Sequence, residues 1–318
     1  MTLQPLPNLR DVFKAQKHVY RYLKPTPLYH YAGLSRLVGA EVWVKHENHQ
    51  PAGAFKIRGG VNLAATLSDE QQKAGLLTAS TGNHGQSIAY AGQLKGVPVT
   101  IAMPEGANPG KVAAIRSFGA EVVFAGQDFD EAREWAAERA RQTGALFVGP
   151  ADFPLIAGVA TYALEILQDL PDVDTIIVPV GGGSGASGVC TVAKTINPAI
   201  EVIAAQSAQA PAAQLSWKAG VPVEAKMRTF AEGVATRVPF ELPQRILRQH
   251  LDDFALVDDE DIKAAIVLHL EHTRNLVEGA GAVSLAAALQ LKGQLAGKKV
   301  ALVVSGGNLA LEKLKLLL

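Results

Sequence analysis

Lys56 lies in a segment that could make its side-chain amine reactive. Residues 54–60 (AFKIRGG) surround it with apolar residues and glycines, after the turn-like stretch 50–53 (QPAG). A lysine that is desolvated among such neighbours loses its charge easily and can form a Schiff base with a carbonyl compound. A surface lysine at the start of a helix would have the same local sequence, so this segment alone does not identify a reactive amine.

Two further segments have the composition of anion-binding turns. Residues 80–86 (STGNHGQ) and 181–185 (GGGSG) each stand between an apolar run and a segment with helical spacing. Backbone N–H groups at a helix start bind phosphate or carboxylate, and glycines let the anion approach closely. The first segment could equally be a plain turn. The second lacks the acidic residue of a dinucleotide fold and the lysine of a Walker loop, which favours phosphate over a dinucleotide.

A fourth segment, residues 305–308 (SGGN), follows the apolar run 300–304 (VALVV). Ligands of open parallel sheets collect outside the carboxyl ends of the strands, which is where this segment falls. The alternative is again a plain turn.

The elements that must position these four segments are short apolar runs, each followed by a segment whose apolar residues have helical spacing. Strands buried on both faces have such continuous runs, and their alternation with helices predicts an α/β fold with mostly parallel, open twisted sheets. The expected strands are residues 76–80, 97–103, 121–125, 175–180, 201–205 and 300–304. The expected helices lie near residues 86–94, 111–118, 130–142, 186–194 and 261–274.

The composition is that of a globular enzyme, with no excess of charge that would attract nucleic acid or a membrane. Of 318 residues, 48% are hydrophobic and 19% are charged, which excludes a disordered chain. Lys plus Arg equal Asp plus Glu at 30 each, so we expect no nucleic-acid or membrane partner. The single cysteine (Cys190), the lack of a membrane-length apolar run and an N-terminus without a signal-peptide core predict a soluble, cytoplasmic protein.

Taken together, the four segments resemble the motifs of the fold-type II pyridoxal-phosphate enzymes, in the threonine/serine dehydratase and serine racemase branch. The likeness extends from residues 26–28 (TPL) and 45–48 (KHEN) to residues 305–308. It implies a tryptophan synthase β-like fold with a large, discontinuous domain of residues 1–73 and 153–318 and an inserted small domain of residues 74–152. It also implies pyridoxal 5'-phosphate as cofactor, a small hydroxy amino acid as substrate, and a homodimer. Because the chain ends at residue 318, we expect no C-terminal regulatory domain.

The resemblance assigns roles to residues of all four segments. Lys56 would bind the cofactor covalently and, once released, remove the substrate Cα proton. The cofactor site would comprise Phe55, Lys56, Asn83, Gly181, Gly182, Gly183, Ser184, Gly185 and Ser305. The substrate would bind to Ser80, Thr81, Gly82, Asn83 and His84, and Glu232, Gly233 and Glu278 would approach the same face. Ser184 stands where the family often has a fourth glycine, and we expect only a modest effect because its N–H is retained.

The implied reaction is α,β-elimination from L-threonine, L-serine or a related 3-hydroxy amino acid, which gives a 2-oxo acid and ammonia. Ser305 would face the pyridine nitrogen with a neutral hydroxyl, which favours prompt elimination. Related racemases have serine in place of Thr81, so a racemase with side elimination is one alternative. Ala54 replaces a common serine, as in dehydratases of bulkier substrates such as phenylserine or 3-hydroxyaspartate. A β-replacement enzyme and a non-catalytic nucleotide-binding module are further alternatives.

No metal site is expected. Many relatives bind a divalent cation through carboxylates after the strand at 201–205, but residues 206–212 (QSAQAPA) contain none. His269 and His272 are three residues apart on an expected helix, without an evident third ligand. We therefore expect these two histidines on a solvated or interface face of that helix.

Overall fold

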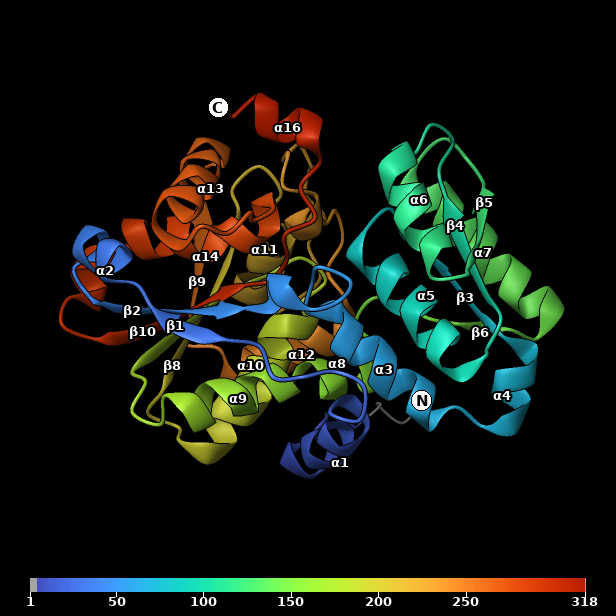
Figure 1. Cartoon of the computed structure of the whole chain (residues 1–318), viewed down its shortest axis with the longest axis horizontal. Coiled ribbons are helices and arrows are strands. Elements are labelled where there is room, and N and C mark those ends of the chain that lie inside the picture. Colours follow the sequence, from blue (N-terminus) through green and yellow to red (C-terminus); the bar gives the residue numbers. More distant parts are fainter. Residues whose placement is uncertain (1–4, 318) are drawn as a thin grey trace.

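The larger of two β-sheets in the computed structural model has six strands, in the order β1-β2-β10-β7-β8-β9 (Figure 1). All neighbouring strands are parallel except β1, which pairs antiparallel with β2 at one edge. The strands are β1 (Leu28–His30), β2 (Glu41–His46), β7 (Thr175–Pro179), β8 (Glu201–Ser207), β9 (Asp253–Val257) and β10 (Lys299–Val304). The structure describes residues 5–317. The first four residues of the N-terminus, for which no signal peptide is expected, lie outside the described residues.

Helices cover both faces of this sheet (Figure 1). Successive residues of a strand point to opposite faces, so Ile176 packs with α8, α9, α10 and α12, whereas Ile177 packs with α2, α13 and α14. The helices of this part are α1 (Leu9–Val19), α2 (Ala32–Val38), α8 (Phe153–Val159), α9 (Thr161–Asp169), α10 (Ser184–Ile196), α11 (Ala212–Ala219), α12 (Glu241–His250), α13 (Asp259–Thr273), α14 (Gly279–Gln290), α15 (Lys292–Leu295) and α16 (Leu311–Lys315), with the 3₁₀ turns η1 (Glu47–His49) and η2 (Glu232–Val234).

A second, four-stranded parallel sheet has the order β5-β4-β3-β6. Ile101 on one face packs with α5 and α6, and Ala102 on the other packs with α7. Its strands are β3 (Leu76–Ala79), β4 (Val99–Met103), β5 (Glu121–Phe124) and β6 (Leu146–Phe147), and its helices are α4 (Asp69–Ala74), α5 (Asn83–Lys95), α6 (Pro109–Ser117) and α7 (Phe129–Thr143).

The α/β class and the predominance of parallel strands are confirmed. All six expected strands form, as β3, β4, β5, β7, β8 and β10. The strands that the sequence did not predict are β1, β2, β6 and β9: β1 and β6 are very short, and charged residues interrupt the apolar pattern of β2. The domain boundaries stay a prediction.

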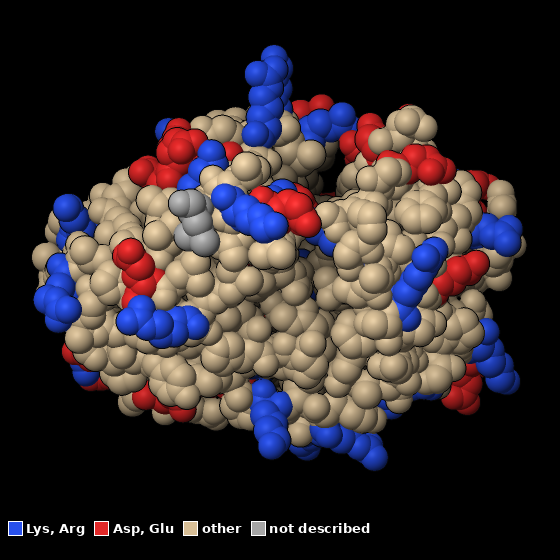
Figure 2. Space-filling view, turned by 45° about the horizontal axis from the view of Figure 1, so that its top comes forward, with Lys and Arg blue, Asp and Glu red and all other residues tan. Residues whose placement is uncertain are grey.

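The surface reflects the balanced composition. Figure 2 shows lysines, arginines and acidic residues interspersed over one face, which is hollowed between two lobes near its upper edge. Within residues 5–317, no helix has both the length and the apolar character needed to cross a membrane.

Helix α3 (Lys56–Thr66) lies between the two sheets and packs on both α5 and α8 (Figure 1). Two adjacent glycines permit this double contact. A Cβ atom on Gly59 would lie 2.9 Å from the carbonyl oxygen of Leu155, and one on Gly60 would lie 2.5 Å from that of Ser87. The first residue of this closely packed helix is Lys56.

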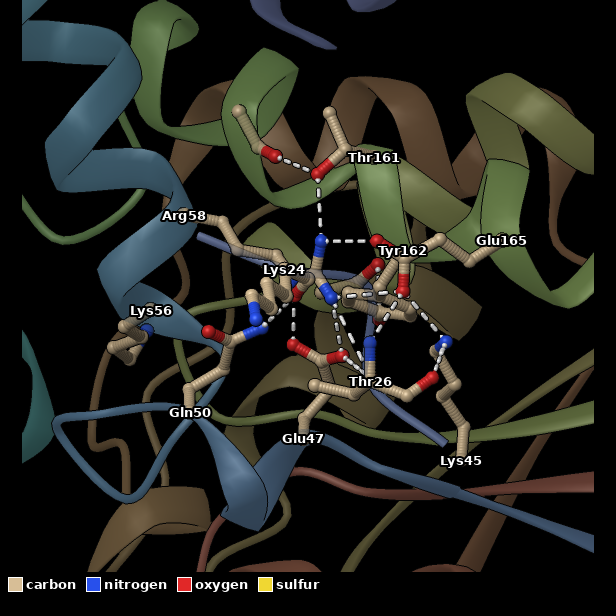
Figure 3. A network of polar contacts seen from close by, with 12 residues as sticks. Lys24, Thr26, Lys45, Glu47, Gln50, Lys56, Arg58, Thr161, Tyr162 and Glu165 are labelled. Atoms are coloured by element: carbon tan, nitrogen blue, oxygen red, sulfur yellow. Dashed lines mark hydrogen bonds and ion pairs between the residues drawn. The ribbon is translucent and has the colours of Figure 1, made fainter. Parts of the chain in front are cut away.

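A buried network of four charged side chains holds the first turn of α3 in place (Figure 3). The Arg58 guanidinium donates to both oxygens of Glu47, at 2.7 and 2.8 Å, and to both oxygens of Glu165, at 2.5 and 2.9 Å. Lys45 Nζ lies 2.6 Å from Glu165 Oε2. The two positive and two negative charges balance, which is required of charges removed from water.

Neutral groups complete this network. The Tyr20 hydroxyl donates to Glu165 at 2.7 Å, and the Thr26 hydroxyl donates to Glu47 at 2.5 Å. Burial alone would raise the pKa of Glu165, but Arg58 and Lys45 hold it below its ordinary value. The network therefore joins α3, the end of β2, α9 and the segment before β1.

The structure corrects the expectation for His269. Its side chain is fully buried, on the same stripe of α13 as Ile262, Ala265 and Ile266, and neither ring nitrogen has a hydrogen-bond partner among the described residues. His272, one turn further, is only partly buried. The spacing 262, 265, 266 and 269 is that of a buried helical face, so helical periodicity would have placed His269 correctly.

We expect Glu165→Gln to lower the free energy of unfolding by about 3–5 kcal/mol, because it leaves a buried positive charge uncompensated. Urea unfolding at neutral pH measures this. The control is Glu138→Gln on the exposed face of α7, whose partner Arg141 is also exposed, and which should leave the unfolding curve unchanged. Equal curves for the two variants would contradict a structural role for the network.

We expect His269 to make the protein less stable in acid. Burial lowers its pKa from 6.5 to about 3, so below pH 6.5 the unfolded chain binds a proton that the folded chain does not. The free energy of unfolding then falls by about 1.4 kcal/mol per pH unit from this histidine alone. The full slope is reached only well below pH 6.5, so between pH 7 and pH 5 this histidine lowers the free energy of unfolding by about 2 kcal/mol in total. His269→Leu should remove that loss in urea unfolding over this range; an identical pH dependence would contradict the prediction.

Candidate active site

Lys56 is positioned by an antiparallel contact between two segments that are far apart in the sequence. Ala54 forms an isolated β-bridge with Gly306, and the Phe55 N–H donates to the carbonyl oxygen of Ser305 at 3.0 Å. Ser305 is buried at the end of β10. Two of the four predicted segments therefore meet at the carboxyl edge of the larger sheet.

The Lys56 amine points toward the glycine-rich segment. Its Nζ lies 3.5 Å from Ser184 Oγ and 4.9 Å from the centre of the Phe55 ring. Part of the side chain faces open space, but protein surrounds the amine closely enough that desolvation lowers its pKa to about 8, against the opposing effect of Glu278. A substantial fraction of this amine is thus neutral near physiological pH.

Residues 181–185 form the turn that begins α10. Gly183 has φ +88°, a left-handed conformation that favours glycine, and Ser184 is the first residue of the helix. A Cβ atom on Gly181 would lie 2.1 Å from the carbonyl oxygen of Gly233, and one on Gly185 would lie 3.5 Å from the Phe55 ring. The first-turn N–H groups of a helix have no acceptor within it, so the turn offers donors for an anion beside Lys56.

Residues 80–84 form a second turn, which begins α5. Ser80 Oγ accepts hydrogen bonds from the N–H groups of Gly82 and Gly85, at 3.2 and 2.9 Å. The His84 ring lies 3.0 Å from the Thr78 hydroxyl, and burial lowers its pKa to about 3, so it is neutral. These two side chains shape the turn from within, while Thr81 and Gly82 stay partly exposed.

Asn83, at the start of α5, forms hydrogen bonds with residues that flank α14 and β10 of the larger sheet. Its side-chain Nδ2 donates to Glu278 Oε1 at 2.7 Å, and its Oδ1 accepts from Asn308 Nδ2 at 2.8 Å. Asn308 also donates to the carbonyl oxygen of Ala52 at 2.8 Å. Burial raises the pKa of Glu278 above its ordinary value. This chain of polar contacts fixes the orientation of the Asn83 amide.

The remaining segments considered in the sequence analysis are residues 232–233 and 206–212. The backbone of Gly233 lies against Gly181, whereas the side chain of Glu232 forms ion pairs with Lys111 of α6 and Lys313 of α16. Residues 206–212 run from the end of β8 through the following turn to the first residue of α11. Within residues 5–317 no three His, Cys, Asp or Glu side chains are grouped so that they could hold a metal ion.

Two features were not predicted from the sequence. Asn308 was part of a predicted motif, but only the structure shows its amide reaching Asn83. The buried charges at Lys45, Glu47, Arg58 and Glu165 also went unrecognised, although charged residues among apolar neighbours in residues 42–47 and 54–60 could have been noticed. Which of these charged residues pair with one another could not be read from their neighbours in the sequence.

The fold and this geometry define an α/β protein whose desolvated Lys56 amine lies beside the glycine-rich start of α10. Comparison with known proteins identifies the cofactor: residues 19–306 match the family model described as "Pyridoxal-phosphate dependent enzyme". The chain belongs to this family. The predicted family, cofactor and enzymatic nature are thereby confirmed.

Individual relatives agree with this assignment. The chain is similar to the L-threonine ammonia-lyase of Thermotoga maritima, with 42% identity over 95% of this chain and 75% of the relative. Its fold is similar to that of maize serine racemase, with a TM-score of 0.94 and 33% identity over 98% of this chain and 97% of the other. It also resembles threonine deaminase isoform 2 of Solanum lycopersicum, with a TM-score of 0.92 and 31% identity over 100% and 95% of the two chains. The predicted fold type is thus confirmed.

The residues present fit pyridoxal phosphate. An amine with a lowered pKa is suited to bind an aldehyde, and the start of α10 beside it is suited to bind a phosphate. We expect Gly181→Ala to weaken cofactor binding about tenfold or more, because its Cβ must displace the backbone at Gly233.

Titration of the purified variant with pyridoxal phosphate, followed by absorbance, measures this affinity. The control is Gly293→Ala in α15, where a Cβ atom has no neighbour within 4 Å. Unchanged affinity in Gly181→Ala would show that residues 181–185 lie away from the cofactor.

Proposed function

We propose that this chain is a pyridoxal-phosphate dependent ammonia-lyase, that is, a dehydratase. Its substrate would be L-threonine, L-serine or a related 3-hydroxy amino acid, and its products a 2-oxo acid and ammonia. The observation that carries the proposal is the desolvated Lys56 amine, set between the starts of α10 and α5 in a chain that shares 42% identity with an L-threonine ammonia-lyase. Elimination needs a neutral base next to two anion sites, one for the cofactor phosphate and one for the substrate carboxylate.

Lys56 is the proposed base. When bound, pyridoxal phosphate supplies an electron sink that stabilises negative charge at the substrate Cα. The neutral Lys56 amine would remove the Cα proton, and its pKa of about 8 matches a base that works near neutral pH. Residues 181–185 would hold the phosphate through backbone N–H groups.

The substrate carboxylate would bind at the start of α5. The backbone N–H groups of Thr81, Asn83 and His84 would serve there, because the first N–H groups of a helix have no acceptor within it. The Gly82 N–H instead donates to Ser80 Oγ. Asn83 and Ser305 would contact the cofactor ring, Asn83 through its amide and Ser305 through a neutral hydroxyl. Glu278, held by Asn83, would keep the amide oriented.

The finer organisation follows the family resemblance. We propose that residues 74–152 move as a small domain against residues 1–73 and 153–318, which would close the carboxylate site over the substrate and exclude water. The arrangement of the smaller sheet supports this, since all its strands lie between Leu76 and Phe147. A homodimer and a cytoplasmic location are part of the same proposal.

A serine or amino-acid racemase with side elimination is the second candidate. The likeness to maize serine racemase favours it. Thr81 disfavours it, because related racemases have serine at this position and the threonine is bulkier. Dehydratases of phenylserine or 3-hydroxyaspartate are narrower versions of the first proposal.

We expect the purified protein to show a visible absorbance band of lysine-bound cofactor that is lost in Lys56→Ala. It should release 2-oxo acid from at least one of L-serine, L-threonine, phenylserine and 3-hydroxyaspartate, and Lys56→Ala should lose more than about a thousandfold in kcat, as expected when a covalent and basic group is removed.

The outcomes separate the candidates. No band after addition of pyridoxal phosphate would overturn the whole proposal. A band with no 2-oxo acid but with loss of substrate chirality would replace the dehydratase by the racemase. Thr81→Ser tests the same choice, since it should increase racemisation relative to elimination if Thr81 restricts it.

A further inference from the structure

We infer that the side-chain hydroxyl of Ser184 is a positioning residue for the Lys56 amine. This inference rests on the proposed function, in which Lys56 is the reacting amine. The family resemblance implied that a serine in place of the fourth glycine changes little, because both provide a backbone N–H. The structure gives the hydroxyl a role that glycine cannot have.

The contact joins residues 128 positions apart in the sequence. Ser184 Oγ lies 3.5 Å from Lys56 Nζ, and it is the hydrogen-bond partner that residues 5–317 provide for this amine. Ser184 is 2% exposed. Its place as the first residue of α10, directly after the left-handed Gly183, sets the direction of its side chain.

A hydroxyl suits both protonation states of the amine. Its oxygen accepts a hydrogen bond from the ammonium, and its O–H donates to the lone pair of the neutral amine. A desolvated ammonium without an acceptor would be costly, and after taking up a proton Lys56 is such an ammonium. Ser184 therefore supports the amine through the cycle of losing and regaining its proton.

The surroundings of Lys56 make this neutral partner important. The titratable groups that interact electrostatically with the amine, among the described residues, are Glu278 at the start of α14 and His84 of α5. Glu278 has a raised pKa and is engaged by Asn83, and His84 is neutral and engaged by Thr78. The positive end of the α10 dipole further disfavours the ammonium.

A probe without a phosphate tests this contact apart from phosphate binding. Pyridoxal condenses with a neutral lysine amine to form a C=N bond and water, and its absorbance band follows the reaction. The full-length protein, freed of bound cofactor, is mixed with pyridoxal between pH 6 and pH 10, and the Lys56→Ala signal is subtracted. The midpoint of the rate against pH then reports the proton affinity of Lys56.

The variants are Ser184→Ala and Ser184→Gly, which lack the hydroxyl, and Ser184→Thr, which keeps it. Ser187→Ala is the matched control, because Ser187 is a buried serine of the same helix whose hydroxyl has no hydrogen-bond partner among the described residues. Circular dichroism checks that each variant is folded.

We expect the midpoint to fall by about half to one pH unit in Ser184→Ala and Ser184→Gly, since a hydrogen bond to the charged form is stronger than one to the neutral form. Ser184→Thr should keep the wild-type midpoint, and so should Ser187→Ala. An unchanged midpoint in both hydroxyl-free variants, or the same shift in Ser187→Ala, would overturn the inference. If the wild type forms no Lys56-dependent band, the proposed function falls as well.

Discussion

The buried network around Arg58 is the constraint on which the rest of the site depends. A guanidinium that is cut off from water must be neutralised, and it finds Glu47 at the end of β2 and Glu165 on α9. Each of these carboxylates then needs its own partners, which Lys45, Thr26 and Tyr20 supply. Because every member compensates another, the segment that starts α3 has one stable position, and Lys56 starts that helix.

Lys56 and Arg58, both in the first turn of α3, have opposite electrostatic surroundings. At Arg58, opposite charges are paired at short distance, and the group keeps its charge. At Lys56, no carboxylate of residues 5–317 forms an ion pair with the amine, and desolvation outweighs the effect of Glu278, so the pKa falls to about 8. The same low-polarity interior therefore supports a permanent cation two residues away from an amine that can become neutral. That difference is what proton transfer near neutral pH requires.

The sequence predicted much of the architecture and of the site. Continuous apolar runs located the strands buried on both faces, and glycines after strands located the turns that begin α5 and α10. It did not predict β9, nor β1 and β6, which are short. It failed for β2, where Lys45 and His46 are polar residues that are buried because they have hydrogen-bond partners. It also failed for His269, because a histidine was taken as polar although helical spacing put it on a buried stripe.

The sequence by itself determined which chemistry is available: a lysine among apolar neighbours, two glycine-rich helix starts and a small-residue turn after a strand. These are local properties, since backbone conformation and helix-start N–H groups depend on a few adjacent residues. Only the tertiary structure decided which side chains touch. The contacts of Lys56 with Ser184, of Asn83 with Asn308 and Glu278, and of Arg58 with Glu165 each join residues more than a hundred positions apart. The lowered pKa of Lys56 also depends on the tertiary structure, because desolvation is a property of the packed surroundings and not of the residue.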